Sequence, residues 1–193
     1  MKLISPLILG SGSPRRKEIL ANAGFEFLVK SSKADESVPD SIPVSKVAAH
    51  LAIVKSNFFR HDLEDHIVLT ADTIVSFKGQ IINKPDSQEE AIKYLQLLSG
   101  NEHQVITGFS IRYKNRQIVD SDVTKVSFRE LEKSEIDYYV SNYKVIDKAG
   151  GYGIQDWIGQ IGITKIDGSF YNVMGLPIHL VYQYLKENFS KEG

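Results

Sequence analysis

The stretch Leu7-Ile-Leu-Gly-Ser-Gly-Ser-Pro-Arg-Arg-Lys-Glu-Ile-Leu20 joins a short apolar run to a turn of glycine and serine, and then to the start of a helix. Ser13 is placed to be the N-cap of that helix and Pro14 its first residue. The cations Arg15–Lys17 follow where unpaired N–H groups and the helix dipole already favour negative charge. A solvated surface turn is the alternative, but the apolar strand before the turn makes it less favoured, because α/β proteins bind ligands where strands meet helices. We therefore predict that this junction binds an anionic, phosphorylated ligand.

The composition fits one globular domain with a substantial core and room for two lobes. The chain has 193 residues, 42% of them hydrophobic and 24% charged. Lys and Arg (23) balance Asp and Glu (24), which argues against a nucleic-acid coat protein. Cysteine is absent, so disulfides and thiolate metal sites are excluded, and the N-terminal apolar run is too short for a signal peptide or a membrane span. We expect a soluble cytoplasmic protein whose partners include neither nucleic acid nor a membrane.

The hydrophobic patterns predict strands that alternate with helices, and hence an α/β fold with a mixed sheet. We expect strands at 7–9, 25–29, 67–77, 80–85, 104–113 and 117–128, and helices at 14–23, 43–60, 87–99, 134–142 and 177–189. The polar segment 30–43 is typical of a mobile loop over a cleft. A hairpin at Asp167-Gly168 and a loop through Tyr171-Asn172 are expected before the last helix.

Two charged residues lie where burial is expected. Lys55 falls on the apolar stripe of the second predicted helix, which is formed by Val44, Val47, Ala48, Leu51 and Phe58. Asp72 interrupts an apolar strand, and a buried carboxylate is costly unless it is paired. If Lys78-Gly79 forms a two-residue turn, Thr73 lies opposite Lys84. Asp72 as a structural carboxylate, and Lys55 and Lys84 as lysines that extend to solvent, are the alternative interpretations.

No Walker P-loop, dinucleotide fingerprint, hydrolase elbow or zinc protease motif is present. His50, His61, His66 and His103 are expected at the surface or at helix ends, and His179 in the last helix without an evident partner. A set of charged residues in otherwise improbable positions remains, and it suits phosphate chemistry, in which cations contact phosphate oxygens and carboxylates bind a divalent metal or accept a proton. Its members are Arg15, Arg16, Glu36, Lys55, Asp72, Lys84 and Lys148.

A series of motifs spans almost the whole chain: Ser11-Gly-Ser-Pro-Arg-Arg16 with Glu18, Ala71-Asp-Thr-Ile-Val75, Asn83-Lys-Pro85, Leu98-Ser-Gly100 with Gln104-Val-Ile-Thr-Gly108, Asp147-Lys-Ala-Gly-Gly-Tyr-Gly-Ile-Gln155, and Gly168-Ser169 with Asn172-Val-Met-Gly-Leu-Pro177. With these motifs, in this order, the chain resembles the Maf family of nucleoside triphosphate pyrophosphatases. The resemblance implies a single elongated α/β domain over residues 1–193, similar to inosine triphosphatases. Its mixed, twisted sheet would be flanked by helices, with two lobes around a central cleft, and the protein would be a homodimer.

The resemblance also implies a reaction, namely hydrolysis of a nucleoside triphosphate to the monophosphate and pyrophosphate with Mg²⁺ or Mn²⁺. Asp72 is similar to the residue that accepts a proton from water, and Glu36 and Asp72 to a metal site. The residues that resemble triphosphate ligands are Ser11, Arg15, Arg16, Lys55 and Lys84, and the substrate-binding set is completed by Lys148.

Three positions match the specificity residues of the subgroup that acts on dTTP and UTP: Arg15, Thr73 and Gln155. The Gln155 amide can both donate and accept a hydrogen bond, as the O4 and N3–H edge of a pyrimidine requires. Asp156 stands where a glycine is usual, and Gly151 where an alanine is usual. Two alternatives stay open: a non-catalytic, nucleotide-binding regulator of septum formation and cell division, and a scavenger of modified pyrimidine triphosphates.

Overall fold

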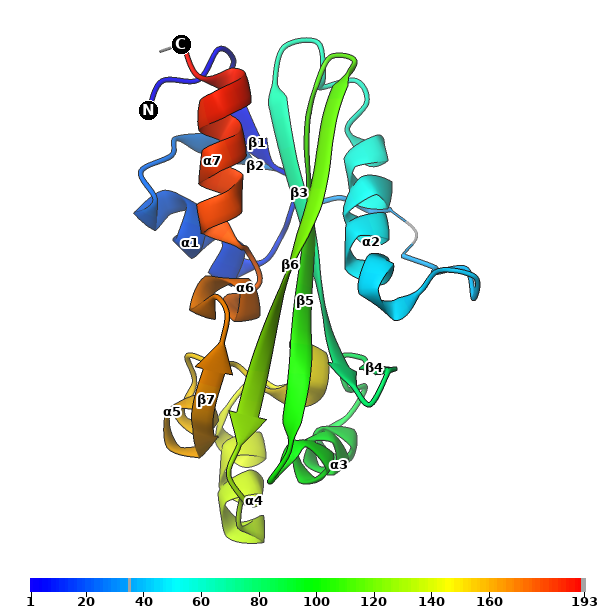
Figure 1. The fold of residues 1–193 in the computed structure, drawn as a ribbon, viewed down its shortest axis with the longest axis vertical. Helices are drawn as coiled ribbons and strands as arrows, with labels where there is room; N and C mark the ends of the chain where they lie inside the picture. Colours follow the sequence, from blue (N-terminus) through cyan, green and yellow to red (C-terminus); the bar gives the residue numbers. More distant parts are fainter. Residues whose placement is uncertain (35, 192–193) are drawn as a thin grey trace. The chain divides into compact units, whose positions relative to one another are not determined.

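The strands of the computed structural model, which describes residues 1–34 and 36–191, form one mixed sheet (Figure 1). Its order is β2-β1-β3-β5-β6-β7, with β4 paired to β3. The strands are β1 (Leu7–Leu9), β2 (Phe27–Val29), β3 (Ile67–Phe77), β4 (Gln80–Ile82), β5 (Glu102–Tyr113), β6 (Arg116–Phe128) and β7 (Ile163–Asp167). β1 is parallel to β2 and β3, whereas β4 and β7 are antiparallel to their neighbours. The predicted mixed α/β fold is confirmed.

The five predicted helices are present, with ends that differ by a few residues at most. They are α1 (Pro14–Asn22), α2 (Val44–Phe58), α3 (Gln88–Leu98), α4 (Lys133–Asn142) and α7 (Ile178–Phe189). Two short helices were not expected, α5 (Trp157–Gly162) and α6 (Phe170–Met174). The prediction of a hairpin at Asp167-Gly168 is wrong, because β7 pairs with β6 and the chain then enters α6, which contains the supposed loop residues Tyr171 and Asn172. Among residues 1–34 and 36–191, no helix is both long enough and apolar enough to cross a bilayer.

The chain folds into two compact units. Unit 1 comprises the described residues of Met1–Asp72, Thr107–Asp122 and Gly175–Gly193, and unit 2 comprises Thr73–Ile106 and Val123–Met174. Strands β3, β5 and β6 contribute residues to both units. The single domain and the cleft between two lobes stay predictions.

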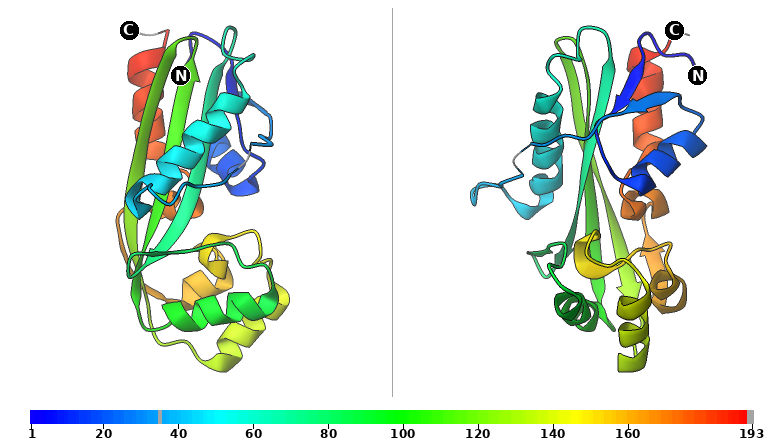
Figure 2. Two further views of the ribbon diagram at one scale, coloured as in Figure 1. Left: turned by 90° about the vertical axis from the view of Figure 1, so that its right-hand side faces the viewer. Right: turned by 180° about the vertical axis from the view of Figure 1, so that it is seen from behind.

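The core of unit 1 is formed by the parallel strands and the helices on their two faces. In β1, Leu7, Ile8 and Leu9 are all buried, as are the residues of β3 beside them. Helix α2 covers one face of this part of the sheet, and α1 and α7 cover the other (Figures 1 and 2). Thr70 Oγ1 donates a hydrogen bond to the carbonyl of Ala52 (2.7 Å), which ties β3 to α2. This contact fixes the two elements that carry Lys55 and Asp72.

Unit 2 contains α3, α4, α5 and a short 3₁₀ helix at Ala149–Gly151. Ser87 caps α3 by accepting a hydrogen bond from the Glu90 amide (3.2 Å). The turn between β3 and β4 has two residues, as predicted, with φ of 51° at Lys78 and 79° at Gly79. Positive φ at both central residues is the geometry that matches the twist of a hairpin.

The prediction that His103 lies at the surface is wrong. His103 lies on β5, and the residue is 2% exposed. Its ring is stacked on Phe128, and its Nε2 lies 2.6 Å from the hydroxyl oxygen of Tyr152. Burial lowers the pKa of His103 from its usual 6.5 to about 4. The imidazole is therefore neutral in the folded protein at neutral pH.

A dependence of stability on pH follows from His103. Because the unfolded chain binds a proton at a higher pH than the folded one, the stabilisation is complete above pH 6.5 and is lost as the pH falls towards 4. This group alone contributes about 3 kcal/mol of that loss. Urea denaturation of wild type and His103→Gln between pH 7.5 and 4.5 measures it. We expect a shallower decline in the variant, and parallel curves would contradict the assignment.

Candidate functional site

The junction between β1 and α1 has the predicted arrangement. Ser13 occupies the N-cap position and Pro14 begins the helix, but the Ser13 side chain makes no capping hydrogen bond. Ser11 is buried, and its Oγ accepts a hydrogen bond from Arg16 Nη1 (3.1 Å). Arg16 Nε donates to the carbonyl of Gly175 (2.8 Å), which lies 159 residues away in the sequence and was not predicted to take part in this junction. The guanidinium is thus fixed within unit 1.

Arg16 lies in a charged environment. Burial lowers the pKa of Arg16, and the carboxylates of Asp72 and Glu36 oppose that shift, whereas Arg15 adds to it. Both predicted carboxylates are therefore close enough to Arg16 to act on its charge. Within unit 1 the structure brings together Ser11, Arg15, Arg16, Glu36, Lys55 and Asp72.

Lys55 is buried on the inner face of α2, as predicted, and is paired. Its Nζ lies 2.5 Å from Asp72 Oδ1 and 3.2 Å from Glu36 Oε1. The ion pair removes the objection to burying either charge alone, because each supplies the counter-ion of the other. The extension of the apolar stripe to Phe58 is wrong: Phe58 is 48% exposed, and Phe59 is buried in its place, in a cluster with Ile8, Leu63 and Val68.

Glu36 and Asp72 converge on one cation. The ammonium of Lys55 contacts both carboxylates, so a position between them is already suited to positive charge. Among the described residues no group of three or more His, Asp or Glu side chains could hold a metal ion. Two carboxylates nevertheless fit Mg²⁺, which is commonly bound by one or two carboxylates together with substrate phosphates and water.

The remaining predicted residues belong to unit 2. Lys84 is exposed and follows β4. The ladder between β3 and β4 ends at Val75 and Ile82, so the predicted pair of Thr73 with Lys84 falls beyond it. The carbonyl of Asn83 accepts a hydrogen bond from the Gly150 amide (3.0 Å), which joins two of the motifs.

Lys148 is buried in unit 2, 7% exposed, among protein oxygens. Its Nζ contacts the carbonyl of Lys144 and lies 3.3 Å from Asp156 Oδ2 and 3.4 Å from Asp147 Oδ1. Gln155 is half-buried, and its Oε1 has no hydrogen-bond partner among the described residues. An acceptor in this state is suited to a donor from a ligand.

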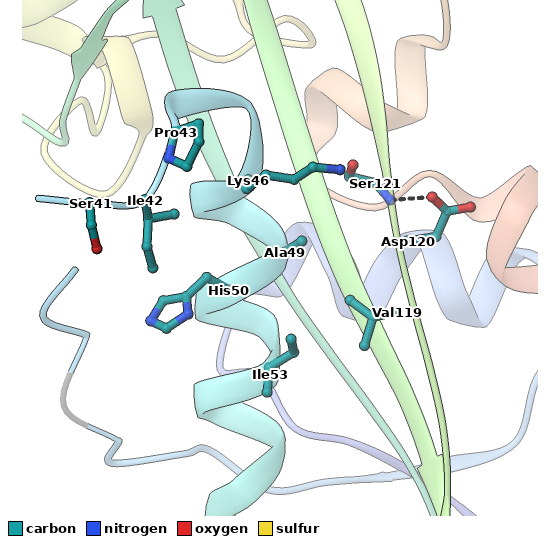
Figure 3. Close-up of a pocket in the computed structure, with 10 residues that line it drawn as sticks. All are labelled: Ser41, Ile42, Pro43, Lys46, Ala49, His50, Ile53, Val119, Asp120 and Ser121. Atoms are coloured by element: carbon teal, nitrogen blue, oxygen red, sulfur yellow. Dashed lines mark hydrogen bonds between the residues drawn. The ribbon is translucent and has the colours of Figure 1, made fainter. Parts of the chain in front are cut away.

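A pocket of about 470 Å³ lies elsewhere in unit 1, between α2 and β6 (Figure 3). Its lining includes Ile42, His50, Ile53 and Val119, and none of the predicted site residues. Asp120 at its edge already accepts hydrogen bonds from the Tyr184 hydroxyl and from the amide of Ser121. The pocket is therefore distinct from the residues predicted to bind phosphate.

The profile of the family described as Maf-like protein matches residues 6–188. The chain belongs to the Maf-like protein family. The dTTP/UTP pyrophosphatase of Phocaeicola vulgatus is 44% identical over 183 residues, which cover 94% of this chain and 95% of that protein. The dTTP/UTP pyrophosphatase of Cytophaga hutchinsonii is 42% identical over 186 residues, or 96% and 85% of the two chains.

A solved structure was also matched. The alignment with the Ham1 protein of Staphylococcus aureus covers 64% of this Maf-like chain and 72% of the Ham1 chain, with a TM-score of 0.44 and 14% sequence identity. This similarity is too low to bear on function.

Proposed function

We propose that this protein is a nucleoside triphosphate pyrophosphatase that hydrolyses dTTP and UTP between the α and β phosphates. The observation that carries the proposal is the buried Asp72 carboxylate, paired with Lys55 and acting on the charge of Arg16. The names of the Maf-like relatives, which cover nearly the whole chain, support it.

In this proposal Asp72 accepts a proton from the attacking water, and the oxygen of that water forms a bond to phosphorus as pyrophosphate leaves. A carboxylate within hydrogen-bond reach of the attacking water can act as such a base. Ser11, Arg15, Arg16 and Lys55 bind the triphosphate, where charge-assisted hydrogen bonds to phosphate oxygens stabilise the charge that develops. Lys84 and Lys148 of unit 2 complete the proposed set.

A divalent cation, Mg²⁺ or Mn²⁺, belongs to the same proposal. Glu36 and Asp72 would hold it, since both carboxylates already face one positive charge. It would neutralise phosphate charge.

Selectivity for thymine and uracil is assigned to Arg15, Thr73 and Gln155. Gln155 Oε1, which accepts no hydrogen bond from the described residues, can accept the N3–H of either base, and cytosine lacks this N3–H. Rates of pyrophosphate release from dTTP, UTP, CTP, GTP and 7-methyl-GTP, with Mg²⁺ or Mn²⁺, test this. We expect dTTP and UTP to react fastest. Preference for the guanine nucleotides would contradict the subgroup, and binding of UTP without any turnover would favour the regulator.

The homodimer and the cytoplasmic location also belong to the proposal. Support for the dimer comes from the family motifs, and support for the location from the absence of cysteine. Sedimentation of the purified protein tests the dimer.

Arg15→Ala is expected to weaken triphosphate binding, because it removes a charge-assisted contact. The loss is on the order of 1.5 to 3 kcal/mol, or roughly 10- to 150-fold in KM. Lys17→Ala is the matched control, since Lys17 is an exposed cation of the same helical turn. Equal effects of the two substitutions on the KM for UTP would show that the first turn of α1 contributes only diffuse charge.

A further inference from the structure

We propose that Asp156 and Tyr139 are positioning residues that hold the ammonium of Lys148 ready for the triphosphate. The inference rests on the proposed function, because it takes Lys148 as a ligand of the substrate. It gives a role to Asp156, which stands where the family usually has a glycine.

The contacts form a chain from α4 to Lys148. The Tyr139 hydroxyl donates a hydrogen bond to Asp156 Oδ2 (2.7 Å) and accepts one from the amide of Gly153 (3.1 Å). The same Oδ2 lies 3.3 Å from Lys148 Nζ. Tyr139 is fully buried and Lys148 is 7% exposed, so water competes little for these bonds. One carboxylate oxygen thus joins a fixed phenol to a buried ammonium.

The backbone around Asp156 is arranged to leave room for this carboxylate. A Cβ on Gly153 would lie 2.6 Å from Asp156 Oδ2. Asp156 is also the N-cap residue of α5, yet its side chain makes no capping hydrogen bond. An aspartate at an N-cap ordinarily accepts from the first turn of its own helix. Here the carboxylate points to Lys148 and Tyr139 instead.

Fixing a lysine before substrate arrives strengthens binding. Its four-carbon side chain has many rotamers, and ordering them on binding lowers affinity. Asp156 restricts the ammonium to one place in advance. Since this contact is made to bound substrate and transition state alike, its loss raises KM and leaves kcat nearly unchanged.

The test is a double-mutant cycle between Asp156 and Lys148. The dissociation constant of α,β-methylene-UTP is measured by calorimetry, so that binding is read without turnover, and KM and kcat for UTP are measured in parallel. We expect Asp156→Asn to weaken binding about fivefold and Lys148→Ala about tenfold or more, and Asp156→Asn to add less than about twofold when Lys148 is already alanine. Tyr139→Phe should act like Asp156→Asn but more weakly.

Asp147→Asn is the matched control, because it removes the same charge at 3.4 Å from the same Nζ on a side chain that is 53% exposed. It should change binding less than twofold. Equal effects of Asp156→Asn in both backgrounds, or a lowered melting temperature and kcat with unchanged affinity, would overturn the proposal and leave Asp156 structural. Unchanged affinity in Lys148→Ala would overturn it too, while turnover by the wild type would leave the proposed function standing. If the dissociation constants of the analogue change as expected in all the variants but the wild type does not hydrolyse UTP, only the proposed activity is refuted.

Discussion

Asp72→Asn is expected to lower kcat for UTP and dTTP by a factor on the order of 10² to 10⁴, the usual contribution of a general base. Asparagine keeps the shape of the side chain, and its carbonyl can still accept from Lys55, but it cannot take a proton from water. KM should change little at saturating Mg²⁺, because Glu36 remains to hold the metal and the cations that bind phosphate stay in place. Steady-state rates of pyrophosphate release from UTP measure the effect.

Asp86→Asn controls for the loss of one negative charge, since Asp86 is an exposed residue of unit 2. It should leave both constants near those of the wild type. An Asp72→Asn enzyme with normal kcat and raised KM would make Asp72 a binding residue, and the base would have to be sought elsewhere.

Gly108→Ala is expected to destabilise the protein by about 3 kcal/mol, at the upper end of the usual range for overpacking. A Cβ on this β5 residue would lie 2.2 Å from the amide nitrogen of Ala49 and 2.4 Å from the carbonyl carbon of Ala48, both in the backbone of α2. A helix backbone cannot rotate aside as a side chain can, so α2 must move. The melting temperature should fall by roughly 10 °C.

Gly12→Ala is the comparison variant. The nearest atom to its added methyl group would be Ser31 Oγ at 3.0 Å, the end of a side chain that can turn away. Its melting temperature should stay within a few degrees of that of the wild type. If Gly108→Ala were equally mild, the close approach of β5 to α2 would not be a constraint on the fold.

The sequence indicates which residues of the site are unusual, but not which contacts they make. Lys55 and Asp72 each interrupt a pattern of apolar residues, Lys55 in a predicted helix and Asp72 in a predicted strand. Both are therefore recognisable from the sequence as unusual. That they pair with each other was not visible, since 17 residues separate them and the contact depends on how α2 packs on β3. The hydrogen bond from Arg16 to the Gly175 carbonyl could not be predicted for the same reason, since 159 residues separate the two.

Other errors came from reading residue type without context. The placement of His103 at the surface is wrong because His103 alternates with Val105 along β5, and both face the core. The prediction of Gly168 as a hairpin glycine is wrong for a similar reason. Its φ is 129°, and an added Cβ would lie 2.7 Å from Thr124 Oγ1, so glycine is required there for close approach to β6. The role of Tyr139 has no signal in the sequence, because nothing there indicates what its hydroxyl contacts.

The most direct test of the account is the identity of the products formed from UTP. ³¹P NMR of a reaction with wild-type protein and Mg²⁺ distinguishes cleavage between the α and β phosphates from cleavage between the β and γ phosphates. We predict UMP and pyrophosphate in equal amounts, with almost none formed by Asp72→Asn under the same conditions. UDP and phosphate, or products formed by Asp72→Asn at the wild-type rate, would contradict the account.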